Sequence, residues 1–145
     1  IVRQYLIDQY LDSKGTIWYE WIGQDKEIGF SLYREEEPLP IYTATKVLIE
    51  QLKGYSFIKR INISNSLDFI LQYKHPTKGV KLVVWTAPPP MESPDKIKSH
   101  YISIPVKKDG VVEIFDIYGA SKMIESRSKV IKVYIHGAPQ YINIK

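Results

Sequence analysis

The stretch TIWYEWIGQ, residues 16–24, organises the interpretation of this chain. Aromatic and β-branched side chains, with a glycine on either side, predict a strand over Thr16–Ile22. Successive side chains of a strand point to opposite faces, and both faces of this strand would be largely apolar. That pattern is typical of a strand covered on both sides, as in a parallel sheet or an α/β barrel.

A dense cluster of aromatic and acidic side chains lies at the end of this predicted strand, made of Trp18, Tyr19, Glu20 and Trp21. Aromatic faces stack on the C–H faces of pyranose rings, and a carboxylate accepts hydrogen bonds from sugar hydroxyls. We therefore take Trp18, Glu20 and Trp21 as candidate substrate-binding residues. The alternative is that large aromatic residues simply fill a core. Glu20 argues against it, because a carboxylate in a strand covered on both sides needs a partner.

The segments on either side predict helices. Ile1–Lys14 carries an apolar stripe and leads to Gly15, which predicts a helix end capped by glycine. Pro40–Lys53 opens with proline, is apolar along one face and is followed by Gly54. Asp25–Pro40 is predicted to be a long connection, and its acidic run EEE is expected to be a solvated face rather than a metal site.

From about residue 55 the apolar pattern changes to the period of two that is typical of strands. The predicted strands are Phe57–Ile63, Leu67–Tyr73, Val80–Thr86, Tyr101–Pro105, Val111–Ile117, Val130–His136 and Gln140–Ile144. Ala87–Lys98 is a proline-rich loop, and Tyr118–Ser128 is predicted to be a polar excursion without a strand. Seven short, nearly evenly spaced strands indicate an antiparallel β-sandwich.

We therefore expect a mainly β chain in two parts. Residues 1–54 would be a helix–strand–helix remnant of an α/β barrel, and residues 55–145 an antiparallel β-sandwich of about seven strands.

Composition excludes several function classes. The chain has 145 residues, 44% of them hydrophobic and 25% charged, with a formal charge of +4 and no cysteine. The basic residues are too scattered for a nucleic-acid partner, and no apolar run is long enough for a membrane span. The three histidines, His75, His100 and His136, lack the spacing of a metal site, so neither metal nor cofactor is expected.

The chain begins at Ile1 without methionine, which predicts a processed chain or a fragment of a longer protein. The absence of cysteine fits a cytosolic protein and a bacterial secreted one alike. For the parent protein, a secreted or periplasmic location is favoured.

A resemblance to a known family runs through most of the chain. The segments VRQYLIDQYLDSKG, WYEW, IGFSLY and PLPIYTATKVLIEQLKGY, in that order, resemble the last helix–strand–helix of the (β/α)₈ barrel in clan A retaining glycoside hydrolases. The similarity is greatest to the β-xylosidase/α-iduronidase-like group. The later segments VKLVVWT, VEIFDIYG and APQYINI resemble the β-sandwich that follows that barrel.

The resemblance implies a role without catalysis for this chain alone. In such barrels the reacting groups lie at the C-terminal ends of the strands. Retaining hydrolysis needs two carboxylates about 5–5.5 Å apart. The family takes them from the fourth and seventh strands, so this chain would hold neither and no catalytic residue is assigned. Trp18, Glu20 and Trp21 would line the sugar site, and the partners would be carbohydrate and the remainder of the barrel.

Two other readings stay open. One is a non-catalytic carbohydrate-binding β-sandwich, with Trp85 and surface tyrosines as its platform. Against it, Trp85 lies in the apolar strand KLVVWT, which favours a core position. The other is a structural interaction domain.

Overall fold

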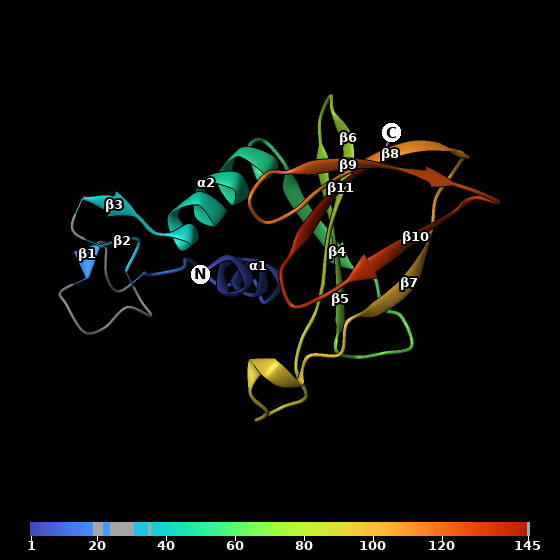
Figure 1. Ribbon diagram of the computed structural model, residues 1–145. Coiled ribbons are helices and arrows are strands. Elements are labelled where there is room, and N and C mark those ends of the chain that lie inside the picture. Colours follow the sequence, from blue (N-terminus) through green and yellow to red (C-terminus); the bar gives the residue numbers. More distant parts are fainter. Residues whose placement is uncertain (19–21, 24–30, 35, 145) are drawn as a thin grey trace. The chain divides into compact units, whose positions relative to one another are not determined.

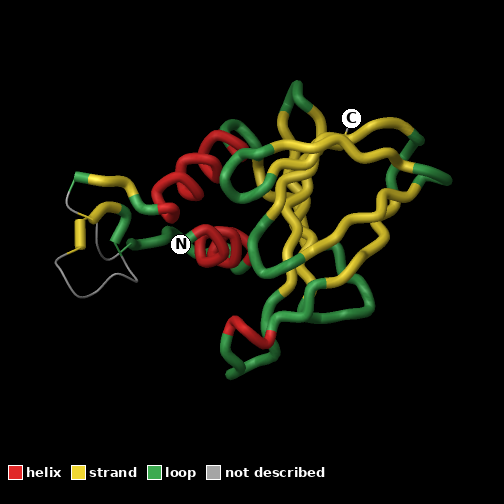
Figure 2. The backbone as a smooth tube through the Cα atoms, in the orientation of Figure 1, coloured by secondary structure: helices red, strands yellow, loops and turns green. Residues whose placement is uncertain are grey.

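The computed structural model describes residues 1–18, 22–23, 31–34 and 36–144. It divides into two compact units, Ile1–Lys53 and Gly54–Lys145, which are described separately. Strands form most of the second unit, as Figure 2 shows. None of the helices in the described part of the chain is long and apolar enough to cross a membrane.

In its described residues, the first unit combines two helices with three very short strands (Figure 1). In chain order these are α1 (Val2–Tyr10), β1 (Ile22–Gly23), β2 (Tyr33–Arg34), β3 (Glu37–Pro38) and α2 (Pro40–Leu52). Strand β1 pairs with β2 in parallel, and β2 pairs with β3 in antiparallel fashion. Two of these strands lie within residues 25–40, where the sequence predicted only a connection.

The first helix ends earlier than predicted, at Tyr10 rather than near Lys14. Asp12 takes the left-handed conformation, with φ of 55°, so the predicted cap at Gly15 is wrong. The Asp12 amide donates to the Gln9 carbonyl at 3.3 Å, and the Ser13 amide donates to the Asp8 carbonyl at 2.9 Å. This pair of bonds is a Schellman motif, which satisfies carbonyls at the helix end.

The strand predicted over Thr16–Ile22 is not seen at its start. Thr16, Ile17 and Trp18 have no strand conformation, and Ile22 belongs to the two-residue strand β1. Residues 19–21 lie outside the described part of the chain. A strand needs a neighbour to pair its backbone groups, and the structure pairs none of its described residues with positions 16–18. Ile17 accordingly projects into solvent, 95% exposed.

Helix α2 confirms the prediction within one residue. Pro40 stands at its start, where the missing N–H costs nothing, and Leu39 is the extended residue before it. Gly54 follows with φ of +78°. The buried face of the helix consists of Ala44, Val47, Leu48 and Leu52.

The second unit is an antiparallel β-sandwich, as predicted, but it has eight strands rather than seven. They are β4 (Ser56–Arg60), β5 (Asp68–His75), β6 (Gly79–Thr86), β7 (His100–Pro105), β8 (Gly110–Phe115), β9 (Ser121–Ser126), β10 (Val130–Ile135) and β11 (Gln140–Ile144). Six of them form one sheet in the order β4-β5-β6-β11-β8-β9, and β10 and β7 form the second sheet (Figure 1). A short 3₁₀ turn, Pro94–Lys96, interrupts the proline-rich loop between β6 and β7.

The main core lies between these two sheets. Its members are aliphatic and nearly inaccessible to solvent: Ile70, Leu82, Val84, Ile102, Ile104, Val112, Ile114, Ile131, Val133, Ile135 and Ile142. They alternate with outward-facing residues along each strand, which is why the sequence period of two located these strands correctly.

Strand β9 corrects the prediction of a polar excursion over Tyr118–Ser128. It pairs with β8 along its whole length and forms the edge of the large sheet. Only Ile124 and Ser126 of this strand are protected from solvent, while Met123 is exposed. An edge strand that is mostly solvated keeps polar side chains, and its sequence then lacks the apolar alternation of an inner strand.

The large sheet is apolar on its second face as well. Leu71, Tyr73, Val83, Trp85 and Tyr141 occupy the strand positions that alternate with the core residues, and all five are buried. Trp85 is only 1% exposed. Its ring stacks on that of Phe69 with 4.6 Å between centroids and 5° between planes. Trp85 therefore cannot serve as the exposed sugar platform that the carbohydrate-binding alternative required.

Candidate functional site

The first unit contains a groove of about 450 Å³ around Trp18, which we call the tryptophan groove. Its lining comes from both helices and from the segment that follows α1: Ile1, Tyr5, Thr16, Trp18, Thr45, Leu48, Ile49, Leu52 and Lys53. Apolar atoms dominate this surface, and Ile49 is 64% exposed, whereas Ala44, Val47, Leu48 and Leu52 of the same helix are buried. The groove is thus a hydrophobic surface open to solvent.

Trp18 enters the groove from a segment anchored to α1. The Thr16 hydroxyl donates a hydrogen bond of 2.7 Å to a carboxylate oxygen of Asp8, which ties the segment to the helix. The indole nitrogen of Trp18 is buried and has no hydrogen-bond partner among the described residues. A buried indole N–H normally finds an acceptor. Trp18 therefore contributes aromatic surface to the groove, and its buried donor has no acceptor among the described residues.

The other two predicted substrate-binding residues, Glu20 and Trp21, lie outside the described residues. Their grouping with Trp18 into a sugar-binding wall remains a prediction. The structure places Trp18 alone of the three.

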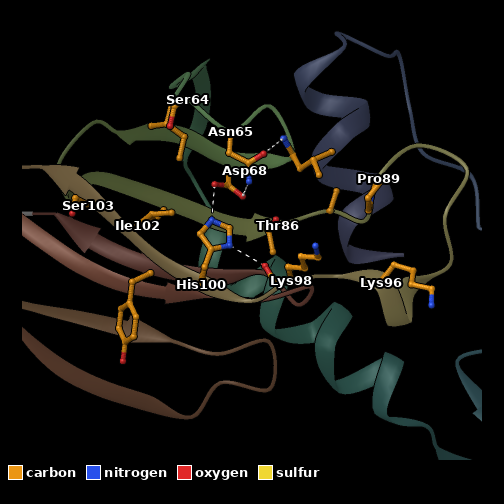
Figure 3. A pocket seen from close by; sticks show the side chains of 14 residues that line it. Ser64, Asn65, Asp68, Thr86, Pro89, Lys96, Lys98, His100, Ile102 and Ser103 are labelled. Carbon is orange, nitrogen blue, oxygen red and sulfur yellow. Dashed lines mark hydrogen bonds and ion pairs between the residues drawn. The ribbon is translucent and has the colours of Figure 1, made fainter.

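The second unit contains a larger pocket, of about 720 Å³, at one end of the sandwich, which we call the aspartate–histidine pocket. It is bounded by the β4–β5 connection, the end of β6, the proline-rich loop and the start of β7 (Figure 3). The pocket is named for Asp68 and His100, which meet in it: His100 Nε2 lies 2.9 Å from Asp68 Oδ2. The Asp68 side chain is 1% exposed and that of His100 is 35% exposed.

The hydrogen bonds of His100 favour its protonated form. Its Nδ1 donates to the Lys98 carbonyl at 2.9 Å, while its Nε2 faces the Asp68 carboxylate. Both partners are acceptors, so both ring nitrogens are best served as donors, as in the imidazolium. The Lys98 carbonyl, and next the Asp68 carboxylate, raise the pKa of His100 above its ordinary value, and burial opposes them.

Asp68 is fixed from a second side by the turn that precedes β5. Asn65 Nδ2 donates to Asp68 Oδ1 at 3.0 Å, and the Leu67 amide donates to Asn65 Oδ1 at 3.2 Å. Each carboxylate oxygen thus has a donor, and the buried charge is compensated.

This arrangement does not suit a nucleophilic triad. Ser64 and Ser103 line the same pocket. A histidine general base needs a free ring nitrogen that faces the serine hydroxyl. Here both ring nitrogens of His100 are engaged, so the pair fixes the pocket and leaves no base to activate a serine.

The sequence showed Asp68 and His100 only as separate residues at strand ends. They are 32 positions apart, and their meeting depends on the pairing of strands into two sheets. The available signal was local, namely the turn sequence Asn65–Asp68, in which an Asx side chain caps the start of a strand.

A third polar group lies on the second face of the large sheet. Lys81, Asn143 and Glu113 are neighbours across β6, β11 and β8. Asn143 Nδ2 lies 3.4 Å from a Glu113 oxygen, and the Lys81 ammonium lies 4.8 Å from the Tyr55 ring. Burial lowers the pKa of Lys81 to about 8, assisted by Lys78 and opposed by Glu113.

No cluster of histidine and carboxylate side chains with metal-binding geometry occurs among the residues that the structure describes. The three sites so far described therefore offer stacking, hydrogen bonding and charge, but no preformed metal centre within that part of the chain.

Comparisons with known proteins point to one fold. No protein-family model matches the sequence, and no curated protein matches it either. Among solved structures, the chain is similar to a family 39 glycoside hydrolase from the gut symbiont Bacteroides cellulosilyticus WH2, with a TM-score of 0.77 and 20% sequence identity. The match covers 99% of this chain and 29% of that protein, so the chain spans less than a third of the neighbour's length. It thus has the fold of a segment of a glycoside hydrolase structure.

Proposed function

We propose that this chain is a segment of a retaining glycoside hydrolase, comprising the end of its (β/α)₈ barrel and an accessory β-sandwich. One observation carries the proposal: the fold match to a family 39 glycoside hydrolase extends over 99% of the chain, through helices and sandwich alike. The order of the sequence motifs, which resemble the end of a clan A barrel and the sandwich beyond it, supports the same assignment.

In this proposal the first unit contributes one wall of the sugar site. Trp18 supports that role because it combines an aromatic face with a buried indole N–H that lacks an acceptor among the described residues. Trp21 would add a second stacking surface, and Glu20 would accept hydrogen bonds from sugar hydroxyls. The two catalytic carboxylates would come from other strands of the barrel, so the chain alone would be inactive.

The sandwich would act as a structural support for the barrel. The second face of its large sheet favours this role, because it carries large buried side chains such as Tyr73, Trp85 and Tyr141. An antiparallel sheet with one solvated face would alternate apolar and polar residues instead. A sheet that is apolar and buried on both faces is suited to a position between two layers of protein.

The test uses the coding sequence upstream of Ile1. The protein that includes it should hydrolyse at least one member of a panel of p-nitrophenyl glycosides, with retention of anomeric configuration in the product by NMR. The 145-residue chain should hydrolyse none. A longer protein without glycosidase activity across the panel, or an upstream sequence without the pattern of a (β/α)₈ barrel, would contradict the proposal.

A further inference from the structure

The aspartate–histidine pocket has the size and shape of a ligand site. Its volume of about 720 Å³ falls within the range of roughly 300–1,000 Å³ that is typical of small-molecule pockets. Strands β5 and β7 contribute Asp68 and His100, whose side chains are joined by a bond of 2.9 Å, and the β4–β5 connection and the proline-rich loop supply most of the remaining lining.

The charge that a ligand would meet in this pocket is positive. Asp68 is buried, and its two oxygens are occupied by Asn65 and His100. Both ring nitrogens of His100 face acceptors, which favours the imidazolium, and Lys98 and Lys96 line the same pocket. Lys96 is partly engaged, because its ammonium lies 3.5 Å from the exposed carboxylate of Asp95. Lys98 is thus the principal cation available to a ligand.

Figure 3 shows how the labelled side chains are placed. Lys98 extends toward Thr86 in the middle of the view, whereas the ammonium of Lys96 lies at the far side. Asp68 and His100 point toward each other. His100 is hydrogen-bonded to the Lys98 carbonyl, so the two residues belong to the same part of the lining.

The rest of the lining suits a ring compound that is apolar on its faces and hydroxylated at its edges. Ile63, Leu67 and Pro89 supply apolar surface for C–H groups. Ser64, Thr86 and Ser103 supply hydroxyl groups at the edges of the pocket. A pyranose ring has C–H faces and hydroxyl edges of this kind, and a carboxylate or sulfate on it would be complementary to Lys98.

From these observations we infer that the aspartate–histidine pocket binds an acidic saccharide, with the carboxylate or sulfate of one sugar unit on Lys98. The choice of a saccharide over other acidic ring compounds rests on the proposed function. The pocket shares no residue with the predicted wall of Trp18, Glu20 and Trp21, and all of its lining residues lie within Gly54–Lys145. It would give the accessory sandwich a binding role of its own.

The experiment titrates the 145-residue chain with a trimer of galacturonic acid, followed by calorimetry and by amide shifts in NMR. The matching neutral trimer, with each carboxylate reduced to an alcohol, serves as the comparison ligand. We expect the acidic trimer to bind and to shift the amides of residues 63–68, 86–89 and 96–103. Lys98→Gln should weaken binding by about fivefold, because one ion pair at an exposed lysine is lost.

A matched variant controls for net charge. Lys122→Gln removes an exposed lysine on β9, away from the pocket, and should leave the affinity within about twofold of the original. Both lysines are on the surface, so neither substitution should impair folding. Binding of the acidic trimer should also weaken as salt is raised, because salt screens the contribution of Lys98.

Three results would overturn the inference: no binding of the acidic trimer at millimolar concentration, equal binding of the neutral trimer, or equal loss in the two lysine variants. Amide shifts of the same size with inorganic phosphate would reduce the pocket to an unspecific anion site and would overturn the saccharide assignment. None of these results bears on hydrolysis by the longer protein, so failure here and failure of the proposed function are distinguishable.

Discussion

The tryptophan groove of the first unit and the aspartate–histidine pocket of the second unit are opposites in how they satisfy their polar groups. In the groove, the indole N–H of Trp18 is buried without an acceptor among the described residues, and the apolar side chain of Ile49 is exposed to solvent. In the pocket, both oxygens of Asp68 and both nitrogens of His100 have partners.

The groove thus has groups that lack partners within the described residues, whereas the polar groups of the pocket are paired. A buried donor without an acceptor costs free energy, and an exposed isoleucine gains nothing from its position. Both features of the groove are accounted for if further protein or ligand covers it, as the proposed barrel would. The pocket already contains its own compensating groups, so its stability and its ligand preference can be tested on this chain alone.

The largest expected effect comes from removing the histidine of the pocket. His100→Ala leaves the buried Asp68 carboxylate with only the neutral donor Asn65. Loss of one partner of a buried ion pair costs about 3 kcal/mol, because the remaining charge is uncompensated. Urea unfolding at pH 6 should show that loss in the free energy of unfolding.

The reverse substitution provides the control for that prediction. Asp68→Ala should cost clearly less than His100→Ala, because the His100 side chain is 35% exposed and can be solvated or lose its proton. Equal costs for the two variants would mean that the carboxylate is not the group whose burial matters.

The next largest effect is a stabilisation, which we expect when Lys81 is replaced. Because burial lowers its pKa to about 8, the unfolded chain binds more protons at this side chain than the folded chain between pH 8 and about 10. The free energy of unfolding should therefore rise with pH over that interval. Lys81→Met should remove this slope and stabilise the protein at pH 7 by about 1–2 kcal/mol, after the loss of its contact with Tyr55.

Thermal unfolding at pH 7 and at pH 9 measures both parts of the Lys81 prediction. Lys132→Met is the matched variant, since Lys132 is exposed on β10. It should retain the slope with pH. A destabilised Lys81→Met protein would show instead that the ammonium makes contacts worth more than its desolvation.

The secondary structure elements differ in how well the sequence predicts them. Helix α2 was predictable because proline, an apolar stripe and Gly54 agree on one element. Seven strands were predictable because their core residues, such as Ile102 and Ile131, recur at every second position. Strand β9 was missed because an edge strand exposes most of its side chains and shows no alternation.

The candidate site residues differ in the same way, but for another physical reason. Trp18 could be singled out from its neighbours in the sequence alone. The Asp68–His100 pair could not, because its two members lie 32 positions apart and meet only through the sheet topology. The end of α1 was misplaced because Asp12, rather than Gly15, takes the left-handed conformation. A hydrogen-bonded Schellman motif can offset the steric cost of a side chain at that position.

A smaller effect is expected from the titration of His100. Its pKa is raised in the folded protein by the Lys98 carbonyl and the Asp68 carboxylate. The resulting stabilisation is fully present below pH 6.5, the ordinary value, and is lost as pH rises through the higher folded-state pKa. Because the imidazole is partly exposed, the change should stay below about 1 kcal/mol.

Chemical unfolding at pH 6 and pH 8 tests this sign. In the original protein, His100 should contribute less to the free energy of unfolding at pH 8 than at pH 6. In His100→Gln, the free energy of unfolding should differ less between the two pH values. A pH dependence that is unchanged in His100→Gln would assign it to other groups.

The smallest effect on stability is expected at Trp18, where the comparison between groove and pocket is sharpest. Removing a tryptophan from a filled core costs about 3–5 kcal/mol. In an open groove, water replaces the lost contacts, and the buried N–H without an acceptor disappears with the ring. Trp18→Ala should therefore cost the 145-residue chain no more than about 1 kcal/mol, close to the cost of Ile17→Ala at the neighbouring exposed position.

In the longer protein of the proposed function, the same substitution should lower kcat/KM by at least about tenfold, because the stacking surface then contacts the sugar. A large loss of stability in the short chain would instead make Trp18 a core residue of the first unit and would remove the groove as a binding wall.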